Sequence, residues 1–264
     1  MNVKFCPLVS GSSGNSTYIG SGNTHILIDA GISCKQLSEH ISQLDMEPSD
    51  IDAVFITHEH IDHIKGVGVL SRKYNIPVYA TYGTWQGIGK TVGEFAPENV
   101  RYVMPNQMTV VGDMCIKPFS IPHDTIEPVA YSVFTEDRKL TVATDIGHVT
   151  DTVKENIYDS DVLLLEANHD VDMLKKGSYP WALKKRILGE RGHLSNVTAG
   201  DTLSEIMSGR LKYVFLGHLS NENNEPHLAY ETVDKILRDN NINVGTYLQL
   251  DMASRYSNSI TVEL

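Results

Sequence analysis

Cysteine is scarce in this sequence. Its 264 residues include three cysteines, Cys6, Cys34 and Cys115, which lie far apart and form no CxxC pair. An odd number of isolated cysteines predicts neither a disulfide framework nor a zinc site made of thiolates. We therefore expect reduced and mostly buried cysteines, as is typical of proteins in the reducing cytoplasm.

Long apolar runs are missing as well. Pro7 and Gly11 interrupt the N-terminal region before the core of a signal peptide can form. No other stretch approaches the roughly 18 consecutive apolar residues that a transmembrane helix needs. The sequence therefore predicts a soluble, cytoplasmic protein with no membrane partner.

Positive charge is in deficit. The chain has 22 lysines and arginines against 33 aspartates and glutamates, which gives a formal net charge of −11. Such a charge argues against a surface that coats nucleic acid by its overall field, so any contact with nucleic acid has to be local. The hydrophobic content of 41% is ordinary for a globular protein, and the length allows a sizeable core.

β-type runs and helical periodicity alternate along the chain. We expect strands at residues 3–9, 17–20, 25–28, 51–57, 77–80, 108–111, 115–121, 129–135, 140–143, 162–165, 213–216, 245–248 and 260–263. We expect helices at 34–44, 64–74, 83–91, 174–188, 196–207 and 228–238. No linker, short repeat or low-complexity segment divides the sequence. The pattern predicts one α/β (α+β) domain over residues 1–264, with two β-sheets between helix layers.

The string HEHIDH at positions 58–63 places three histidines and an aspartate within six residues, directly after an apolar run. Imidazole nitrogens and carboxylates are ligands that zinc, manganese and iron ions prefer. Layered α/β folds commonly present such groups at the carboxyl ends of strands. The candidate metal ligands in this string are His58, His60, Asp62 and His63.

Three more candidate ligands stand at the ends of predicted strands, namely His123, Asp145 and His218. A single histidine at a strand end is more often structural than metal-binding, but the presence of the 58–63 string favours a metal site. Asp29 ends another predicted strand, where it either hydrogen-bonds a ligand histidine or caps the following turn.

The loop at residues 10–16, SGSSGNS, is rich in small polar residues. Its backbone N–H groups, together with Ser13 and Asn15, are suited to binding an anionic substrate. An ordinary tight turn is the alternative interpretation.

A local basic segment spans residues 175–191. It carries six cations against one acid, with two aromatic rings interleaved. Lys184, Lys185 and Arg186 are candidate contacts to a nucleic-acid backbone, with the aromatic rings stacking on exposed bases. The alternative is a solvated helix face with Trp181 packed in the core.

The order of these ligands, HxHxDH followed by a strand-end histidine, aspartate and histidine, resembles the pattern of the metallo-β-lactamase superfamily over the whole chain. The resemblance implies a four-layer αββα sandwich. It also implies a site for two divalent ions, zinc or manganese with iron as a further option. In that site His58, His60 and His123 hold one ion, Asp62, His63 and His218 hold the other, and Asp145 bridges them.

The implied chemistry is hydrolysis by a hydroxide held between the two ions. Ions about 3.5 to 4 Å apart can lower the pKa of a shared water from about 15.7 to about 7. We expect Asp62 and Asp145 to be essential for turnover.

Two later segments resemble the tRNA 3′-processing phosphodiesterases of this superfamily. Glu166 stands at a strand end, and residues 192–195 (GHLS) resemble the GHS-type loop of those enzymes, although Leu194 departs from the usual string. By this resemblance His193 donates a proton to the leaving oxygen or contacts the phosphate, and Glu166 orients it. His169 is a rival for the role of proton donor.

Within the superfamily the chain resembles the YycJ/WalJ-type group, through its SGSSGNS opening and the HLSNENN segment at 218–224. That resemblance implies a metal-dependent 5′-to-3′ exonuclease acting on DNA. Asp145 follows His123 by 22 positions and precedes His218 by 73, which leaves no room for a β-CASP insertion. Alternatives are a small-molecule hydrolase acting on a thioester, lactam or cyclic phosphodiester, and a non-enzymatic regulatory protein, although no ligand of the pattern is missing.

Overall fold

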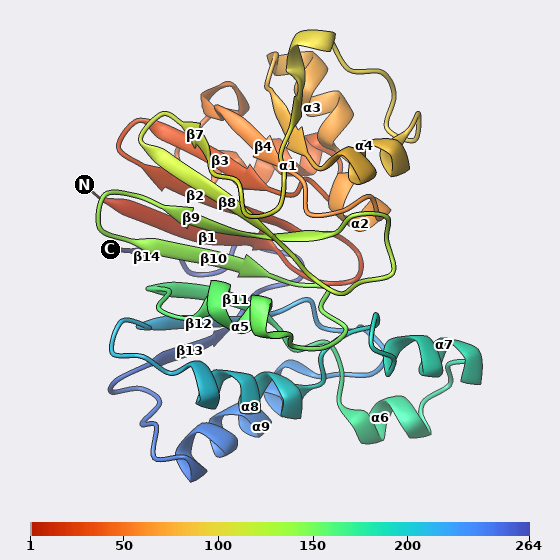
Figure 1. Cartoon of the computed structure of the whole chain (residues 1–264), viewed down its shortest axis with the longest axis vertical. Helices are drawn as coiled ribbons and strands as arrows, with labels where there is room; N and C mark the ends of the chain where they lie inside the picture. The colour runs from red at the N-terminus through yellow and green to blue at the C-terminus, as the bar shows by residue number, and fades with distance from the viewer. Residues whose placement is uncertain (1) are drawn as a thin grey trace. The chain divides into compact units, whose positions relative to one another are not determined.

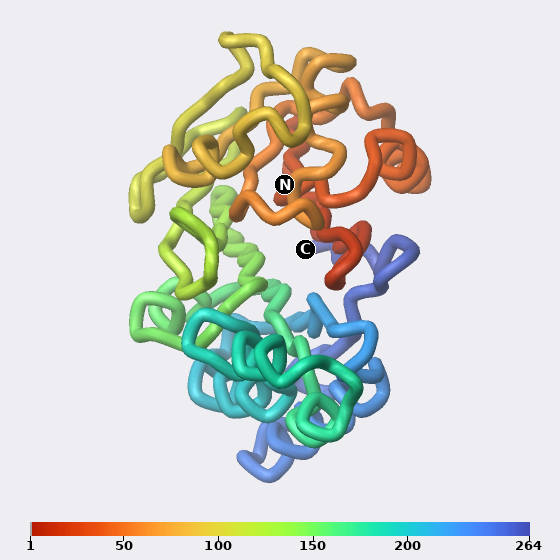
Figure 2. Tube along the Cα trace, turned by 90° about the vertical axis from the view of Figure 1, so that its right-hand side faces the viewer, coloured from red at the N-terminus to blue at the C-terminus, as the bar shows by residue number. Residues whose placement is uncertain are grey.

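The computed structural model describes residues 2–264, and the chain divides into two compact units (Figures 1 and 2). The first unit contains the residues up to Ser120 together with Thr125–Arg138 and Ser254–Leu264. The second contains Ile121–Asp124 and Lys139–Ala253. Among residues 2–264, no helix combines the length and the apolar character that crossing a membrane requires.

A seven-stranded sheet with the order β14-β1-β2-β3-β4-β5-β6 runs through the described residues of the first unit. Its strands are β1 (Val3–Val9), β2 (Ser16–Ser21), β3 (Thr24–Ile28), β4 (Ala53–Phe55), β5 (Val78–Ala80), β6 (Val100–Tyr102) and β14 (Val262–Glu263). β1, β2 and β3 pair antiparallel, whereas β3 to β6 pair parallel. The last strand, β14, pairs antiparallel with the first.

Helices of the first unit follow the strands of this sheet. They are α1 (Cys34–Ser42), α2 (Ile61–Ile64), α3 (Val67–Tyr74) and α4 (Tyr82–Ile88), with short 3-10 turns at Pro48–Asp50 and Pro97–Asn99. α1 begins at a capping box, in which the Ser33 side chain accepts from the Gln36 N–H and the Gln36 side chain accepts from the Ser33 N–H. Its buried Leu37 and Ile41 share one apolar core with Val54 of β4, which holds the helix against the sheet.

Three further strands of the first unit, β7 (Thr109–Val111), β8 (Met114–Ser120) and β9 (Val129–Phe134), form an antiparallel meander. Tyr131 of β9 packs edge-to-face on Phe55 of β4, with 5.5 Å between the ring centroids. The Tyr131 hydroxyl donates to the Ile56 carbonyl at 2.8 Å, and the Val129 N–H donates to the Thr57 carbonyl. The meander therefore packs on the segment that leads into the histidine string.

The second unit alternates parallel strands with helices. Its strands are β10 (Lys139–Ala143), β11 (Val162–Glu166), β12 (Tyr213–Gly217) and β13 (Gln249–Met252), which pair parallel in this order. Its helices are α5 (Asp151–Ile157), α6 (Val171–Lys176), α7 (Trp181–Ile187), α8 (Asn196–Ile206) and α9 (Pro226–Asp239). α8 and α9 pack against each other (Figure 1). β11 is buried along its whole length, as expected for a central parallel strand.

Most predicted strands are confirmed, but several expectations differ from the structure. The strand expected at 245–248 is wrong, because Gly245 has φ +89° and its N–H closes a turn on the Leu248 carbonyl, so β13 begins at residue 249. The helix expected at 174–188 is two short helices, because Gly177 ends α6 and Pro180 precedes α7. Helix α5 has no counterpart among the predicted elements.

Candidate metal centre

The histidine string continues directly from β4 in the first unit. His58 and His63 are fully buried, whereas His60 and Asp62 are partly exposed. His58 Nε2 lies 3.1 Å from His60 Nδ1, and the rings of His58 and His63 are 4.1 Å apart. His63 Nε2 lies 3.6 Å from Asp62 Oδ2. The four side chains predicted as ligands from this string therefore converge at one place.

Asp29, at the end of β3, holds His63 in position. Its Oδ2 lies 2.8 Å from His63 Nδ1, and its Oδ1 accepts from the Thr57 N–H at 2.8 Å. Of the two alternatives for Asp29, these contacts show the hydrogen bond to a histidine of the string. Burial raises the pKa of the Asp29 carboxyl, which the hydrogen bonds and the charge of His63 counteract. Because the Asp29 carboxylate accepts the Nδ1 proton, His63 Nε2 keeps its lone pair for a metal ion.

The loop at residues 10–16 packs against this cluster. Asn15 is buried, and its Nδ2 lies 3.1 Å from His63 Nε2 and 3.5 Å from Asp62 Oδ2. The Asn15 N–H also donates to the Asp62 carbonyl at 2.8 Å, while Ser13 is exposed. A Cβ on Gly31 would stand 1.6 Å from the Asp62 carbonyl oxygen, so glycine is required there. The 10–16 loop and Gly31 together fix the position of the Asp62 backbone.

A second cluster lies in the second unit, at the ends of parallel strands. His218 follows β12 and Glu166 ends β11, with His218 Nδ1 2.9 Å from Glu166 Oε1. Asp145 Oδ1 lies 3.4 Å from His218 Nε2 and 3.7 Å from His123 Nε2. His193 Nδ1 lies 2.7 Å from Glu166 Oε1. Asp145, Glu166, His193 and His218 each offer a ligand atom within 4.8 Å of the others.

Three residues of these clusters have left-handed backbone conformations, which are unusual outside glycine. They are Asp29 (φ +64°), Asp145 (φ +60°) and His218 (φ +54°). Each follows a strand, so a sharp turn of the backbone takes the side chain out of the sheet. Strain of this kind persists where the surrounding structure enforces it and is typical of functional sites.

Glu166 is fully buried and uses both carboxylate oxygens. Oε1 faces the two histidines, while Oε2 accepts from the Ile146 N–H at 2.9 Å and the Leu194 N–H at 3.0 Å. Burial alone raises the pKa of this carboxyl, but the charges and hydrogen bonds of His193 and His218 outweigh burial and lower it. An ionised Glu166 therefore accepts Nδ1 protons from both histidines. In His218 this leaves Nε2 as the ligand atom.

Two more histidines of the second unit, His123 and His169, differ in their surroundings. His123 Nδ1 lies 3.2 Å from the Gly192 carbonyl, and burial lowers the pKa of this imidazole. His169 is 2% exposed, and burial lowers its pKa to about 4. Within residues 2–264, His169 Nδ1 has no hydrogen-bond partner. His193, in contrast, is partly exposed and paired with Glu166.

Three supporting residues escape sequence reasoning. Thr57 Oγ1 lies 3.0 Å from His58 Nδ1. Asn168 Nδ2 donates to the His218 carbonyl at 2.9 Å. Asp124 Oδ1 lies 3.4 Å from His123 Nε2. Short polar side chains of this kind are common in turns, so only their contacts reveal the role.

The basic residues predicted to touch the substrate lie on α7 with different surroundings. Lys184 is buried, and its ammonium donates to the carbonyls of Lys175 and Gly177. Arg186 forms an ion pair with Asp124. Lys185 is exposed. Trp181 is 67% exposed, so the alternative that it packs in the core is wrong.

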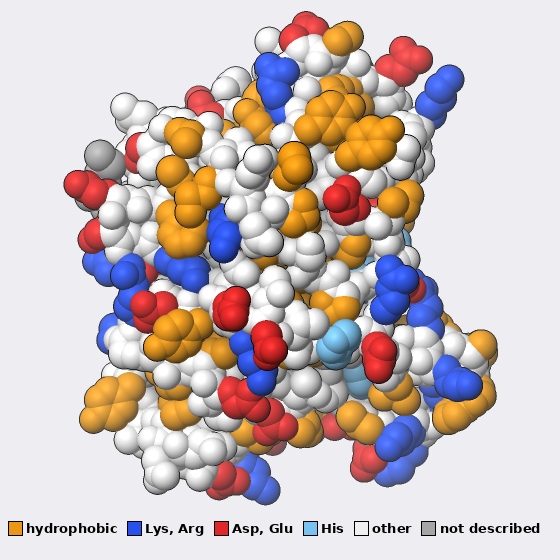
Figure 3. Space-filling view, viewed as in Figure 1, with side chains coloured by type: hydrophobic (Ala, Val, Ile, Leu, Met, Phe, Trp, Pro, Cys, Tyr) orange, Lys and Arg blue, Asp and Glu red, His pale blue; other side chains and the backbone are white. Residues whose placement is uncertain are grey.

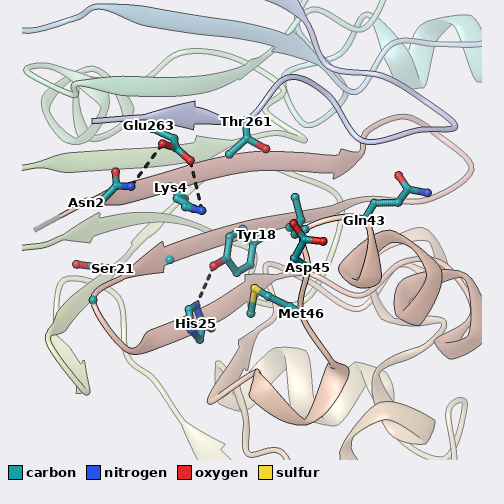
Figure 4. A pocket seen from close by; sticks show the side chains of 13 residues that line it. Asn2, Lys4, Tyr18, Ser21, His25, Gln43, Asp45, Met46, Thr261 and Glu263 are labelled. Atoms are coloured by element: carbon teal, nitrogen blue, oxygen red, sulfur yellow. Dashed lines mark hydrogen bonds and ion pairs between the residues drawn. The ribbon is translucent and has the colours of Figure 1, made fainter.

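A pocket of about 590 Å³ lies elsewhere in the first unit, along β1, β2 and the loop after α1 (Figure 4). In it, the Tyr18 hydroxyl lies 2.8 Å from His25 Nδ1, and Lys4 pairs with Glu263 at 3.3 Å. No candidate metal ligand is among the described residues that line it. We therefore assign this pocket no part in the chemistry.

Comparison with known proteins identifies the family. A model of the β-lactamase superfamily domain matches residues 24–215. The chain belongs to this superfamily. It is 36% identical over 250 residues to exodeoxyribonuclease YycJ of Bacillus anthracis, with 95% of each chain covered. It is 39% identical over 247 residues to exodeoxyribonuclease WalJ of Streptococcus pneumoniae serotype 2 (strain D39), covering 93% of this chain and 92% of that protein.

The superfamily fold is also seen in a solved structure. The metallo-β-lactamase fold protein YhfI of Bacillus subtilis superposes with a TM-score of 0.72 at 17% identity, with full coverage of both chains. The predicted αββα sandwich and the predicted superfamily are thereby confirmed. Each unit of this superfamily member carries a cluster of side chains suited to divalent metal ions.

Proposed function

We propose that this chain is a metal-dependent exonuclease that hydrolyses DNA from the 5′ end. The observation that carries the proposal is the similarity to two exodeoxyribonucleases over more than nine tenths of the chain. The paired histidines on Glu166 add chemical support, because phosphodiester hydrolysis needs a proton for the leaving oxygen. The three free cysteines fit a cytoplasmic location.

The metal ions are part of this proposal. His58, His60 and His123 would hold one ion, Asp62, His63 and His218 would hold the other, and Asp145 would serve both. The donor set fits, because Asp29 and Glu166 occupy Nδ1 of His63 and His218 and leave Nε2 for a metal. Imidazole and carboxylate suit zinc or manganese, with iron as a further option. When bound, such ions polarise phosphoryl oxygens and make hydroxide available at neutral pH.

His193 is the proton donor to the leaving oxygen in this proposal. Its Nδ1 lies 2.7 Å from Glu166 Oε1, and its partial exposure leaves it accessible to a substrate. Glu166 orients the ring through Nδ1. His169 is the weaker candidate, because a pKa of about 4 leaves roughly 0.1% of it protonated at pH 7.

Asp62 and Asp145 are the carboxylates on which turnover depends. Asp62 is positioned by its backbone contact with Asn15, and Asp145 by the left-handed turn after β10. Each carboxylate supplies negative charge that offsets the charge of the ions. Ser13 at the surface of the 10–16 loop is a candidate substrate contact, whereas Asn15 is engaged with His63.

The function is tested with end-labelled DNA and the purified chain in metal-defined buffer. Duplex and single-stranded DNA carrying 5′ or 3′ labels, with matching RNA, are incubated with zinc or manganese. We expect stepwise release of nucleotides from the 5′ end. A parallel panel of thioester, lactam and cyclic phosphodiester substrates tests the small-molecule alternative. Turnover of one of these with no degradation of DNA would reject the exonuclease assignment.

A further inference from the structure

Helix α7 buries Ile187 in the usual way, but it also buries a lysine and exposes a tryptophan. Lys184 is 8% exposed, and its ammonium donates to the Lys175 carbonyl at 2.8 Å and the Gly177 carbonyl at 2.7 Å. Trp181 is 67% exposed. A surface helix normally buries its large apolar residues and exposes its lysines. The Trp181 indole therefore contributes little to the core, and its ring is accessible to a binding partner.

The exposed face of α7 combines this indole with positive charge. Lys185 is spaced i+4 from Trp181, so the two side chains lie on the same side of the helix. Lys175 and Lys176, at the end of α6, are exposed as well. Figure 3 shows Lys and Arg side chains gathered among hydrophobic ones over α6 and α7. We call Lys175, Lys176, Trp181 and Lys185 the arm surface.

Contacts within the second unit tie the arm surface to the candidate site. Arg186 pairs with Asp124, and the other oxygen of that carboxylate lies 3.4 Å from His123 Nε2. The Ile187 carbonyl, at the end of α7, accepts from the His193 N–H at 3.0 Å. The C-terminal end of α7 is therefore hydrogen-bonded to the backbone of the histidine proposed to protonate the leaving oxygen.

We propose that the arm surface binds the unpaired end of a DNA strand, with a base stacked on Trp181 and phosphates beside the three lysines. This proposal rests on the proposed function and names the form of substrate that the site receives. An exposed indole stacks on any base, and lysines neutralise phosphates without reading sequence. In a chain of net charge −11, a local group of cations is where a polyanion can bind.

The first experiment reads Trp181 directly. The chain contains two tryptophans, and Trp85→Phe leaves Trp181 as the single one. Phosphorothioate oligothymidylate is titrated into the full chain with its metals, because this backbone slows hydrolysis during the measurement. We expect saturable quenching of Trp181 fluorescence that follows binding measured by anisotropy. Saturable binding without quenching would overturn the proposal.

The second experiment compares variants by binding and salt dependence. Trp181→Ala should weaken binding about ten-fold, while Trp181→Phe retains most of the affinity because a phenyl ring also stacks. Replacing Lys175, Lys176 and Lys185 together with Gln should reduce the slope of log affinity against log salt by about 2. Lys35→Gln is the matched control, since its side chain is 88% exposed on α1 in the first unit, and it should change neither quantity.

The results separate this proposal from the proposed function, because binding is measured without turnover. If Trp181→Ala folds, as judged by thermal unfolding, and binds as tightly as wild type, the arm proposal is wrong and the nuclease assignment stands. If Trp181 is quenched but no metal supports DNA degradation, the nuclease assignment is wrong and the arm surface remains a nucleic-acid contact. Tighter binding to blunt duplex than to single strands would also overturn the arm proposal.

Discussion

Asp29 Oδ2 lies 2.8 Å from His63 Nδ1, and both side chains are buried. This contact decides which nitrogen of His63 is left for a metal ion. The same relation recurs in the second unit, where Glu166 Oε1 lies 2.9 Å from His218 Nδ1. In each unit a buried carboxylate thus orients a histidine proposed as a ligand. The effect of the charge on this carboxylate can be tested by substitution.

Replacing Asp29 with Asn should weaken metal binding roughly 10- to 100-fold. The amide keeps the shape of the side chain but presents N–H donors, so His63 shifts its proton to Nε2 and loses the lone pair. Asp45→Asn is the matched control, because Asp45 is an exposed aspartate with φ +58°. Competition with a metal-binding dye gives the affinity. Equal affinities for the two variants would contradict this role of Asp29.

Replacing His193 with Ala should lower the rate of DNA hydrolysis about 10²- to 10⁴-fold, because a general acid is lost. The loss should be much smaller for a phosphodiester of p-nitrophenol, whose leaving oxygen needs no proton. Steady-state kinetics on both substrates, with metal content checked, make the comparison. An equal loss on both would show that His193 does not act as the proton donor.

Replacing Gly31 with Ala should destabilise the fold by about 1 to 3 kcal/mol, because the added methyl group overlaps the Asp62 carbonyl and the Asn15 backbone. The displaced Asp62 should also reduce metal content. Gly209→Ala is the control, since a Cβ there meets no atom within 4 Å. Urea denaturation and elemental analysis check both effects, and a Gly31 variant as stable as the Gly209 variant would refute the close packing.

Acid should destabilise the protein through His169. Burial lowers the pKa of this imidazole to about 4, while an unfolded-chain histidine titrates near about 6.5. Between these two pKa values the folded state binds fewer protons than the unfolded state. The contribution of His169 to the free energy of unfolding is therefore complete above pH 6.5 and is lost as the pH falls toward 4. The complete loss is on the order of 3 kcal/mol.

His169→Gln removes this contribution. The free energy of unfolding of the variant, from urea denaturation, should therefore fall less between pH 7 and pH 5 than that of wild type. The same fall in both proteins would show that His169 is not held neutral.

The sequence predicts features made by residues that are adjacent along the chain. It does not predict contacts between residues that only folding brings together. HEHIDH is visible at 58–63 because its ligands are adjacent along the chain. Strand-end positions of Asp145 and His218 follow from the apolar runs before them. The contact of Asp124 with His123 and the hydrogen bond from Asn168 to His218 require the folded chain.

Helix α7 shows a further limit of sequence reasoning. Its seven residues span two turns, too few for a hydrophobic period to define a buried face. Lys184 is buried and Trp181 is exposed, whereas a surface helix is expected to expose its lysines and bury its large apolar side chains. The carbonyls of Lys175 and Gly177, which receive the Lys184 ammonium, come from a preceding helix end that the sequence predicts as part of one continuous helix.

The central claim is that one chain holds two divalent ions bridged by Asp145. Elemental analysis of the purified chain, with end-labelled DNA degradation measured on the same sample, tests it most directly. We expect two ions per chain in active wild type, and at most one ion with no detectable degradation in Asp145→Ala. Full activity of wild type with a single ion, or wild-type rates in Asp145→Ala, would contradict it.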